Sequence, residues 1–353
     1  MLKQEELDKI KELLDHASNP VFFFDNDVDG LASFLLLRRY CGKGKGVAIK
    51  SYPDLGAVYS RKLHEFSPDT VFVLDKPMVA KEFVQEMEQL NCNMVWIDHH
   101  PSNINEFKDK LGKNIFYFNP LMNGESNEPT SYLCYNAIRK KDDEWIALLG
   151  CLADWFIPPF AKEFSQENHD FFPYTEDPAK AFFTTPIGTM VRVLDFALKD
   201  RTTNIVRTLK ILLDIKNYKD LTEENNKTIP VFARFKQINK KYQKILEKGK
   251  KMKTGKLLFF RYGGALSLSS ELANELFYLN QDKVVVVAYT KGNKANVSVR
   301  GLINVRDLAC NALKGMEATC GGHKNACGAT VSVDNLGRFR GNLLRMLDTG
   351  NYI

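Results

Sequence analysis

Short runs of apolar residues alternate with helical patterns over the first 155 residues of the chain. The helical patterns cover residues 30–40, 80–90 and 130–139. The apolar runs have the length of strands, and turn or polar residues bound each of them. They cover residues 21–24, 47–52, 71–75, 94–98 and 115–119. Strands that are apolar on both faces are buried on both faces, so the pattern predicts an α/β fold with a parallel sheet and flanking helices.

Charged residues stand where three of these predicted strands end. One strand ends in the sequence DNDVDG, the second ends in VFVLD, and the third runs into IDHH. Parallel strands end at the same edge of a sheet, and α/β proteins bind their ligands at that edge. We therefore expect seven side chains to converge there: Asp25, Asp27, Asp29, Asp75, Asp98, His99 and His100.

Five carboxylates at one edge repel each other unless a cation lies among them. Aspartate oxygens and imidazole nitrogens suit Mn²⁺ or Mg²⁺ better than a thiolate-seeking metal. Two such ions about 3.5–4 Å apart clamp a phosphoryl group and activate a water, so we predict two Mn²⁺ (or Mg²⁺) ions per site. A calcium-binding loop fits poorly, because the twelfth position counted from Asp25 is Leu36 and not glutamate.

The middle of the chain carries no recognisable motif until a basic helix begins. Residues 156–230 contain short helical patterns and predict a helical insert. From Val231 the apolar residues are spaced four, three, four and three, which predicts an amphipathic helix with Phe235 and Tyr242 in the core. Between Arg234 and Lys256 there are ten basic residues and one acidic residue. Such a stripe favours a polyanionic partner, although a solvated helix face is the plainer alternative.

A second, smaller α/β domain is predicted from residue 256. The runs KLLFFRY, VVVVAYT and ANVSVRG predict strands. Residues 269–279, 304–316 and 335–348 predict helices, the first capped by Ser269 or Ser270. The sequence CGGHKNACGATVSV predicts a glycine-rich loop around His323 that leads into another strand.

Composition and charge place the chain among soluble proteins. It has 353 residues, a net charge of +6, and 44% hydrophobic residues. No apolar run approaches the roughly 20 residues that span a bilayer, so we expect no membrane partner. The seven cysteines are scattered and never form a CxxC pair, which predicts buried, unpaired thiols in a reducing compartment. We expect a cytoplasmic protein.

The set of motifs resembles the DHH phosphoesterase superfamily, which holds RecJ-type nucleases, nano-RNases, cyclic-dinucleotide phosphodiesterases and family II pyrophosphatases. DNDVDG and IDHH carry the resemblance, with Asp75 between them and Asp154 in LLGCLADWF. NPLMNGESNEPTSYL is similar to the NP…TS stretch of the family, and SVRG with GGHKNACGAT looks like its associated substrate-binding domain. The resemblance implies a catalytic domain over 1–158, a helical insert and basic connector helix over 159–255, and a DHH-associated substrate-binding domain over 256–353.

The resemblance also implies a role for each motif residue. The expected metal ligands are Asp25, Asp27, Asp29, Asp75, His99 and Asp154, with Asp75 bridging the two ions. The residues expected to take part in catalysis are Asp29, Asp75, Asp98, His99 and His100. Asp98 would orient the histidines or bind metal directly, and His100 would contact the scissile phosphate or protonate the leaving group. Ser298, Arg300, Gly321, Gly322 and His323 would grip a phosphate across the cleft.

The chain departs from the family pattern in three places. Many relatives open the first motif with a histidine, and Asp25 is the nearest equivalent here, as in RecJ-like members. Cys320 replaces the first of the three glycines that usually precede the loop histidine. Asp75 is followed by KPM, where small polar residues are more usual.

Three functions are compatible with these features. The first is a metal-dependent, RecJ-like exonuclease on single-stranded DNA or RNA or on short oligonucleotides, with the basic helix tracking the backbone. The second is a phosphodiesterase for small substrates, as in nano-RNases or hydrolases of cyclic dinucleotides and 3′-phosphonucleotides, which would not need the basic helix. The third is a non-catalytic scaffold that binds replication or repair proteins, and the complete set of metal-ligand residues argues against it.

Overall fold

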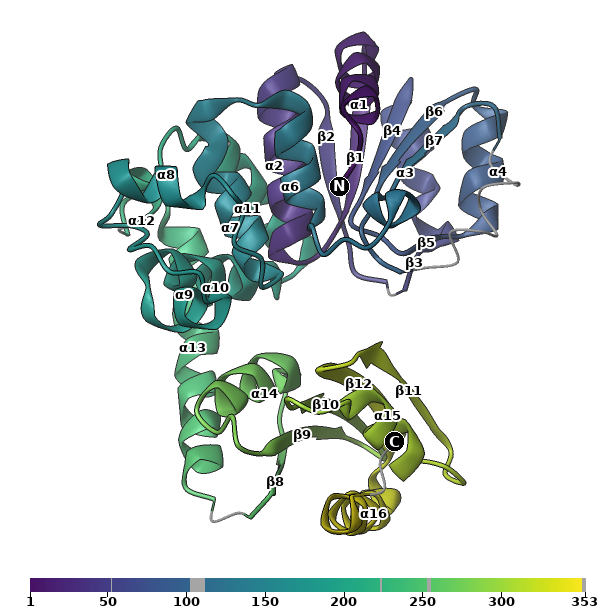
Figure 1. The fold of residues 1–353 in the computed structure, drawn as a ribbon. Helices are drawn as coiled ribbons and strands as arrows, with labels where there is room; N and C mark the ends of the chain where they lie inside the picture. Colours follow the sequence, from purple (N-terminus) through teal and green to yellow (C-terminus); the bar gives the residue numbers. More distant parts are fainter. Residues whose placement is uncertain (52, 102–111, 223, 253–254, 351–353) are drawn as a thin grey trace. The chain divides into compact units, whose positions relative to one another are not determined.

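The computed structural model describes residues 1–51, 53–101, 112–222, 224–252 and 255–350. The chain forms two compact units, Met1–Lys236 and Gln237–Ile353 (Figure 1). The boundary between the units falls inside one long helix, α13 (Ile229–Lys250). The three-part division over 1–158, 159–255 and 256–353 stays a prediction.

The first unit is built around a five-stranded parallel sheet in the order β2-β1-β4-β6-β7. Its strands are β1 (Pro20–Asp25), β2 (Lys45–Ile49), β4 (Thr70–Leu74), β6 (Asn93–Ile97) and β7 (Ile115–Phe118). The predicted α/β fold with a parallel sheet is confirmed. The second strand ends at Ile49, earlier than predicted, and Tyr52 lies outside the described residues. A small parallel pair was not foreseen, β3 (Asp54–Leu55) with β5 (Met78–Val79).

Helices cover both faces of this sheet (Figure 1). Side chains alternate along β1, so Phe22 and Phe24 join a core with α1, α2, α6 and α7, while Val21 and Phe23 join a core with α3 and α4. Both sets are fully buried, which is why the strand reads as a continuous apolar run. The helices are α1 (Gln4–His16), α2 (Val28–Cys41), α3 (Arg61–Phe66), α4 (Lys81–Gln89), α6 (Thr130–Ile138) and α7 (Glu144–Ala153), with short 3₁₀ turns at Ala57–Tyr59, Pro120–Asn123 and Lys141–Asp143.

The predicted helical insert extends the core on the side of α2 and α7. Its buried residues, among them Phe164, Leu194 and Leu209, belong to the same hydrophobic cluster as α2. The helices are α8 (Ala161–Glu167), α9 (Pro178–Thr184), α10 (Pro186–Leu198), α11 (Thr202–Asp214) and α12 (Lys219–Thr222). Within the described ranges, no single helix has the length and apolar character to cross a bilayer. Only α9 and α10 taken together do, and a bend of 76° separates them.

Helix α13 is amphipathic, as predicted. Ile238, Tyr242 and Leu246 are buried, and the Tyr242 hydroxyl donates a hydrogen bond to Glu275 Oε2 at 2.7 Å. Lysines on its other faces are exposed, namely Lys240, Lys241, Lys244 and Lys248. The helix continues through Gly249 to Lys250, and residues 253–254 lie outside the described residues.

The second unit is a five-stranded mixed sheet in the order β11-β12-β10-β9-β8. Only β8 and β9 are parallel, and the other pairs are antiparallel. Helices α15 and α16 pack on one face, and α14 lies against β9 and β10 on the other. The elements are β8 (Leu257–Gly263), α14 (Ser269–Tyr278), β9 (Val284–Lys291), β10 (Lys294–Arg300), α15 (Val305–Ala312), β11 (Ala318–His323), β12 (Ala326–Ser332), a 3₁₀ turn (Val333–Asn335) and α16 (Leu336–Thr349).

Two sequence predictions about this unit are wrong. The segment around His323 is the edge strand β11 rather than a loop, because its backbone pairs with β12 from Ala318 to His323. The cysteines are not all unpaired, because Cys310 of α15 and Cys320 of β11 form a disulfide. The scattered spacing offered no sign of this pairing, which depends on α15 packing against β11. Of the five free cysteines, Cys92, Cys134, Cys151 and Cys327 are buried and Cys41 is half-buried.

Candidate metal centre and binding face

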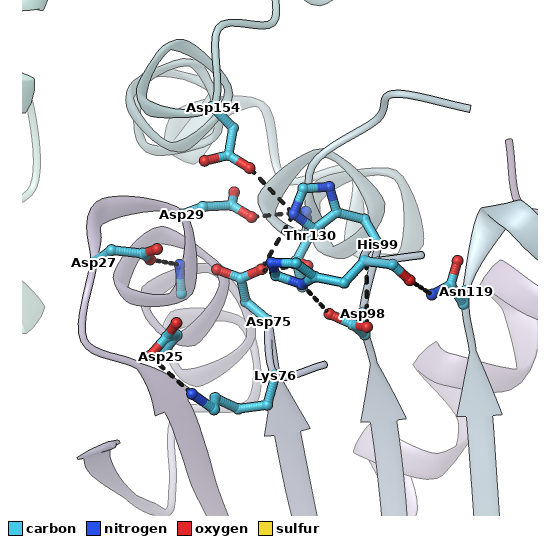
Figure 2. A network of polar contacts seen from close by, with 12 residues as sticks. Asp25, Asp27, Asp29, Asp75, Lys76, Asp98, His99, Asn119, Thr130 and Asp154 are labelled. Atoms are coloured by element: carbon cyan, nitrogen blue, oxygen red, sulfur yellow. Dashed lines mark hydrogen bonds and ion pairs between the residues drawn. The ribbon is translucent and has the colours of Figure 1, made fainter. Parts of the chain in front are cut away.

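The three aspartates of DNDVDG lie at the junction of β1 and α2 (Figure 2). Asp25 ends the strand, and Asp27 caps the helix, since its Oδ1 accepts a hydrogen bond from the Gly30 N–H at 2.9 Å. Gly30 approaches the strand so closely that a Cβ at this position would lie 2.5 Å from the carbonyl oxygen of Asp25. Only glycine permits this approach, and the tight junction holds all three carboxylates at the carboxyl edge of the sheet.

Asp29 is fully buried and is held by the start of another helix. Its two carboxylate oxygens accept hydrogen bonds from the backbone N–H groups of Thr130, at 2.8 Å, and Ser131, at 3.0 Å. These residues open α6, and the unpaired N–H groups at a helix start favour negative charge. The TS of the NP…TS segment therefore serves the site through its backbone, a role that the side-chain pattern could not reveal.

Asp75 lies at the centre of the cluster (Figure 2). It follows β4 directly, is 1% exposed, and has a φ of 60°, a left-handed conformation that residues other than glycine rarely adopt. Its Oδ1 accepts a hydrogen bond from Thr130 Oγ1 at 3.3 Å and lies 3.3 Å from His99 Nε2. Such a conformation costs about 1–3 kcal/mol and is typical of functional sites, where the surrounding structure enforces it.

The two histidines of IDHH have different partners. His99 Nε2 lies 3.1 Å from Oδ2 of Asp154, the residue that follows the last turn of α7. His100 Nδ1 donates to Asp98 Oδ1 at 2.8 Å, and the backbone carbonyl of His100 accepts from Asn119 Nδ2 at 3.0 Å. Asp98 is fully buried and bonds the ring of His100, and whether it orients the histidines or binds metal directly stays a prediction.

Burial perturbs the three aspartates of the first motif. The pKa of Asp25 rises to about 6, chiefly because of burial and then because of repulsion by Asp75, although Lys76 opposes the rise. Burial, followed by repulsion from neighbouring carboxylates, also holds the pKa values of Asp27 and Asp29 well above their usual range. These groups therefore release their protons more readily when a cation enters the cluster.

The histidines and Asp75 stabilise one another's charged forms. Burial acts against the ionised form of Asp75, but His99 outweighs it and lowers the pKa of this carboxyl. Burial likewise disfavours a protonated His99, but Asp154 and Asp75 outweigh it and raise the pKa of the ring well above its usual value. The protonated ring of His99 thus offsets the negative charge of Asp75 and Asp154, as a bound metal ion would do if it replaced the proton.

Three overlapping groups of side chains have the geometry to hold a divalent ion. In each group, one ligand atom per residue lies within 4.8 Å of the others. The groups are Asp29–His99–Asp154, Asp75–His99–His100 and Asp25–Asp27–Asp75. Carboxylate oxygens with imidazole nitrogens fit Mn²⁺ or Mg²⁺, so the residues present suit the metals predicted from the sequence. Asp75 belongs to two of these groups, and its role as a bridge between two ions stays a prediction.

Lys76 is a member of the site that sequence reasoning did not identify. Its side chain is fully buried, and its Nζ lies 3.2 Å from Asp25 Oδ1 and 2.8 Å from the carbonyl oxygen of Ser51 (Figure 2). The signal in the sequence was a lysine placed directly after the strand-ending Asp75, in the KPM departure from the family pattern. A lysine is rarely fully buried unless it is paired, and here the partner is one of the predicted metal ligands.

The residues predicted to bind substrate in the second unit share one face of its sheet. Residues directly opposite one another on antiparallel strands point to the same face. Arg300 of β10 lies opposite Ala326 of β12, which lies opposite His323 of β11. Ser298 lies two residues before Arg300 and therefore points the same way. The opposite face carries the apolar core under α15 and α16.

Two glycines leave part of this face open. Gly321 and Gly328 lie opposite each other on β11 and β12, and a Cβ at either position would meet no atom within 4 Å. Gly322 has a different role, because its φ is 137° and a Cβ there would lie 2.5 Å from the carbonyl oxygen of Ala326. The face beside Ser298 is therefore accessible, while Gly322 is required by the backbone.

Helix α14 holds the polar side chains of this face in position. Arg300 donates from Nε to Asn274 Oδ1 at 2.6 Å and from Nη2 to Ser270 Oγ at 2.9 Å. Ser298 Oγ donates to Ser269 Oγ at 3.1 Å. The prediction that Ser269 or Ser270 caps α14 is wrong, since the cap position is Leu268 and has no side-chain bond. The two serines orient the candidate substrate residues instead.

Comparison with known proteins agrees with this geometry. Residues 257–347 match the family described as the DHHA1 domain. The structure of RecJ with Mn²⁺ from Thermus thermophilus is similar to this chain, with a TM-score of 0.64 and 15% identity. The chain therefore shares its fold with this RecJ, and residues 257–347 carry the match to the DHHA1 domain. The structural match covers 97% of this chain but only 54% of that RecJ chain, so this chain spans about half the length of that relative.

Two further solved structures have a similar fold. Exonuclease RecJ bound to manganese has a TM-score of 0.59 and 15% identity, covering 97% of this chain and 94% of that one. The pGpG-specific phosphodiesterase PggH from Vibrio cholerae has a TM-score of 0.55 and 11% identity, covering 94% of this chain and 99% of that one. No curated protein sequence matches the chain. At these identities the likeness shows the fold, and the named activities are those of the relatives.

Proposed function

We propose that this DHH protein is a metal-dependent phosphodiesterase that acts as an exonuclease on single-stranded DNA or RNA, including short oligonucleotides. The observation that carries the proposal is the convergence of Asp29, Asp75, His99 and Asp154 at ligand distance on one edge of the sheet. Similar folds that bind manganese, RecJ among them, support a hydrolytic use of this edge. The completeness of the ligand set favours an enzyme over a scaffold.

The chain's own residues would orient the reaction. When bound, a pair of Mn²⁺ or Mg²⁺ ions supplies Lewis acidity to a phosphoryl group and lowers the pKa of an attacking water. His100 holds a proton near that position, because Asp98 and Asp75 outweigh burial and raise the pKa of the ring. With Nδ1 bound to Asp98, Nε2 is the atom that would donate a proton to the leaving oxygen.

Residues beyond the metal centre would bind the rest of the strand. Arg300 and His323 offer donors for a phosphate on a face that two glycines keep open, and Ser298 lies on the same face with its hydroxyl bonded to Ser269. The exposed lysines of α13 would follow the remaining backbone through charge. Their contribution depends on the salt concentration, which separates long strands from dinucleotides as substrates.

A half-exposed aromatic cluster beside the metal centre offers a stacking surface for a base. Trp155 follows Asp154 directly, has a φ of 58°, and stacks on Phe182 with ring centroids 5.2 Å apart. Phe183 lies 5.9 Å from the same indole, and the Arg192 guanidinium lies about as far from both phenylalanine rings. Aromatic rings near a phosphoryl-transfer centre are typical platforms for single-stranded bases.

A direct test compares end-labelled single-stranded DNA, single-stranded RNA and dinucleotides as substrates in the presence of Mn²⁺. We expect stepwise loss of terminal nucleotides with the wild-type protein. Asp29→Ala should abolish it, because the carboxylate is removed from the metal centre. Asp8→Ala, an exposed residue of α1, is the matched control and should retain full activity. Equal hydrolysis by wild type and Asp29→Ala, or hydrolysis that chelator leaves unchanged, would refute the proposal.

A phosphodiesterase for small substrates is the alternative enzyme, since PggH has a similar fold. A salt titration separates the two. Affinity for a strand that contacts several phosphates falls with salt in proportion to the number of contacts, with a slope of about −0.7 per contact for single strands. A dinucleotide would lose little affinity over the same range. Preference for a dinucleotide with a flat salt response would assign the small-substrate function.

A further inference from the structure

Lys76 is fixed at both ends inside the candidate metal centre. Its backbone carbonyl accepts a hydrogen bond from Trp96 Nε1 at 2.8 Å, and Trp96 is itself buried. Its Nζ donates to Asp25 Oδ1 and to the carbonyl oxygen of Ser51, and the side chain has no exposed surface. The ammonium group therefore cannot leave the cluster by rotating into solvent.

The position of this ammonium makes the candidate ligand groups unequal. Asp25 belongs to the Asp25–Asp27–Asp75 group, and Lys76 already donates a charge-assisted hydrogen bond to it. An ion in this group would lie beside a fixed positive charge that burial screens poorly.

The carboxylates on the other side of the centre have partners of a different kind. Asp29 is held there by two backbone N–H groups, and Asp154 by His99. Each oxygen of Asp29 accepts one of these bonds, and neither kind of partner carries the permanent positive charge of a lysine. Imidazole also binds a metal in its neutral form, so His99 adds no positive charge once it is a ligand.

We propose that Lys76 sets the order of metal loading. The ion held by Asp29, His99 and Asp154 binds tightly in the free protein, and the ion at Asp25, Asp27 and Asp75 binds weakly until an anionic substrate offsets the lysine charge. This inference rests on the proposed function in one respect, namely that the acidic cluster is a site for divalent ions. Groups that contact a metal ligand alter metal affinity by about 10–100-fold, so we expect the two affinities to differ by that factor.

The test is a Mn²⁺ titration of the metal-free, full-length protein without substrate, followed by calorimetry and by the electron paramagnetic resonance of bound manganese. Wild type should show one tight and one weak ion per chain. Lys76→Met keeps the length of the side chain but removes its charge, and it should tighten the weak ion by about 10–100-fold. Lys50→Met is the matched control. Lys50 is exposed, bonds the carbonyl oxygen of Asp200 at 2.6 Å, and its loss should change neither affinity.

Two aspartate variants keep the test decisive if Lys76→Met does not fold. Asp25→Asn should weaken only the weak ion, whereas Asp29→Asn should remove the tight one. Two ions of equal affinity in wild type, or loss of the tight ion in Asp25→Asn, would overturn the role of Lys76 while the proposed function stands. If no Mn²⁺ binds to the folded wild-type protein, the proposed function itself fails. Circular dichroism establishes that each titrated variant is folded.

Discussion

Replacing Gly30 by alanine tests why a glycine follows the third aspartate of the first motif. The added Cβ would lie 2.5 Å from the carbonyl oxygen and 2.8 Å from the nitrogen of Asp25, both backbone atoms. Neither can move aside as a flexible side chain would. The start of α2 must shift away from β1, and overpacking of this kind typically costs about 1–3 kcal/mol.

The intrinsic preference of helices for alanine opposes this cost. Alanine is favoured over glycine in a helix interior by about 1 kcal/mol. We therefore expect Gly30→Ala to lower the free energy of unfolding by a net of up to about 2 kcal/mol. Gly341→Ala in α16 is the matched control, because Gly341 is exposed and a Cβ there meets no atom within 4 Å. It should raise stability by about 0.4–1 kcal/mol.

Urea denaturation measures both variants. The three tryptophans, Trp96, Trp145 and Trp155, all lie in the first unit, so their fluorescence reports the unfolding of the unit that contains Gly30. Far-ultraviolet circular dichroism follows the control. Gly30→Ala should also weaken Mn²⁺ binding, because Asp25 and Asp27 are displaced together. If Gly30→Ala is as stable as wild type and binds Mn²⁺ equally well, the close approach of α2 to β1 does not determine the site.

Three further predictions concern pH and substrate binding. In the metal-free folded protein the pKa values of Asp25 (about 6), Asp27 and Asp29 are raised, so protonation of these groups stabilises the fold. This stabilisation is complete below their pKa in the unfolded chain, near 3.9, and is lost as the pH rises through their pKa values in the folded protein. Mn²⁺ needs the ionised carboxylates, so the rise in Tm that it causes should be larger at pH 7.5 than at pH 5.5; equal rises would contradict this. Trp155→Ala should weaken oligonucleotide binding by about 1–3 kcal/mol in fluorescence anisotropy, whereas Trp155→Phe should retain most of it. An equal loss of oligonucleotide affinity in both variants would show that Trp155 does not stack on a base. Arg300→Lys removes the guanidinium group that bonds both Asn274 and Ser270, and it should raise KM with little change in kcat. A fall in kcat at constant KM would contradict a role for Arg300 in substrate binding alone.

The parallel sheet and its acidic edge could be predicted from the sequence because both depend on local patterns. Each strand is a continuous apolar run, and each charged residue follows a strand directly, so parallel pairing alone brings Asp25, Asp75 and Asp98 to one edge. The strand ends were less certain, as β2 shows, because hydrogen bonding to a neighbouring strand decides where a strand stops.

Features that depend on distant packing could not be read in the same way. The N–H groups that hold Asp29 belong to Thr130 and Ser131, and backbone donors leave no trace in residue types. Nothing in KPM indicates that Lys76 is buried, yet its ammonium group bonds Asp25 and Ser51 inside the site. The pairing of β11 with β12 also overrode its glycines, which in isolation indicate a loop.

The bonds between Asp29 and the start of α6 have a consequence for biosynthesis. They join residues 101 and 102 positions apart, so the first motif emerges from the ribosome long before the segment that fixes it. Asp154 follows later still. A nascent chain that has exposed only DNDVDG therefore lacks the backbone groups that hold Asp29, and the Asp29–His99–Asp154 group is complete only after α7 has been translated and has docked. The fold thus delays the assembly of this group until most of the first unit exists.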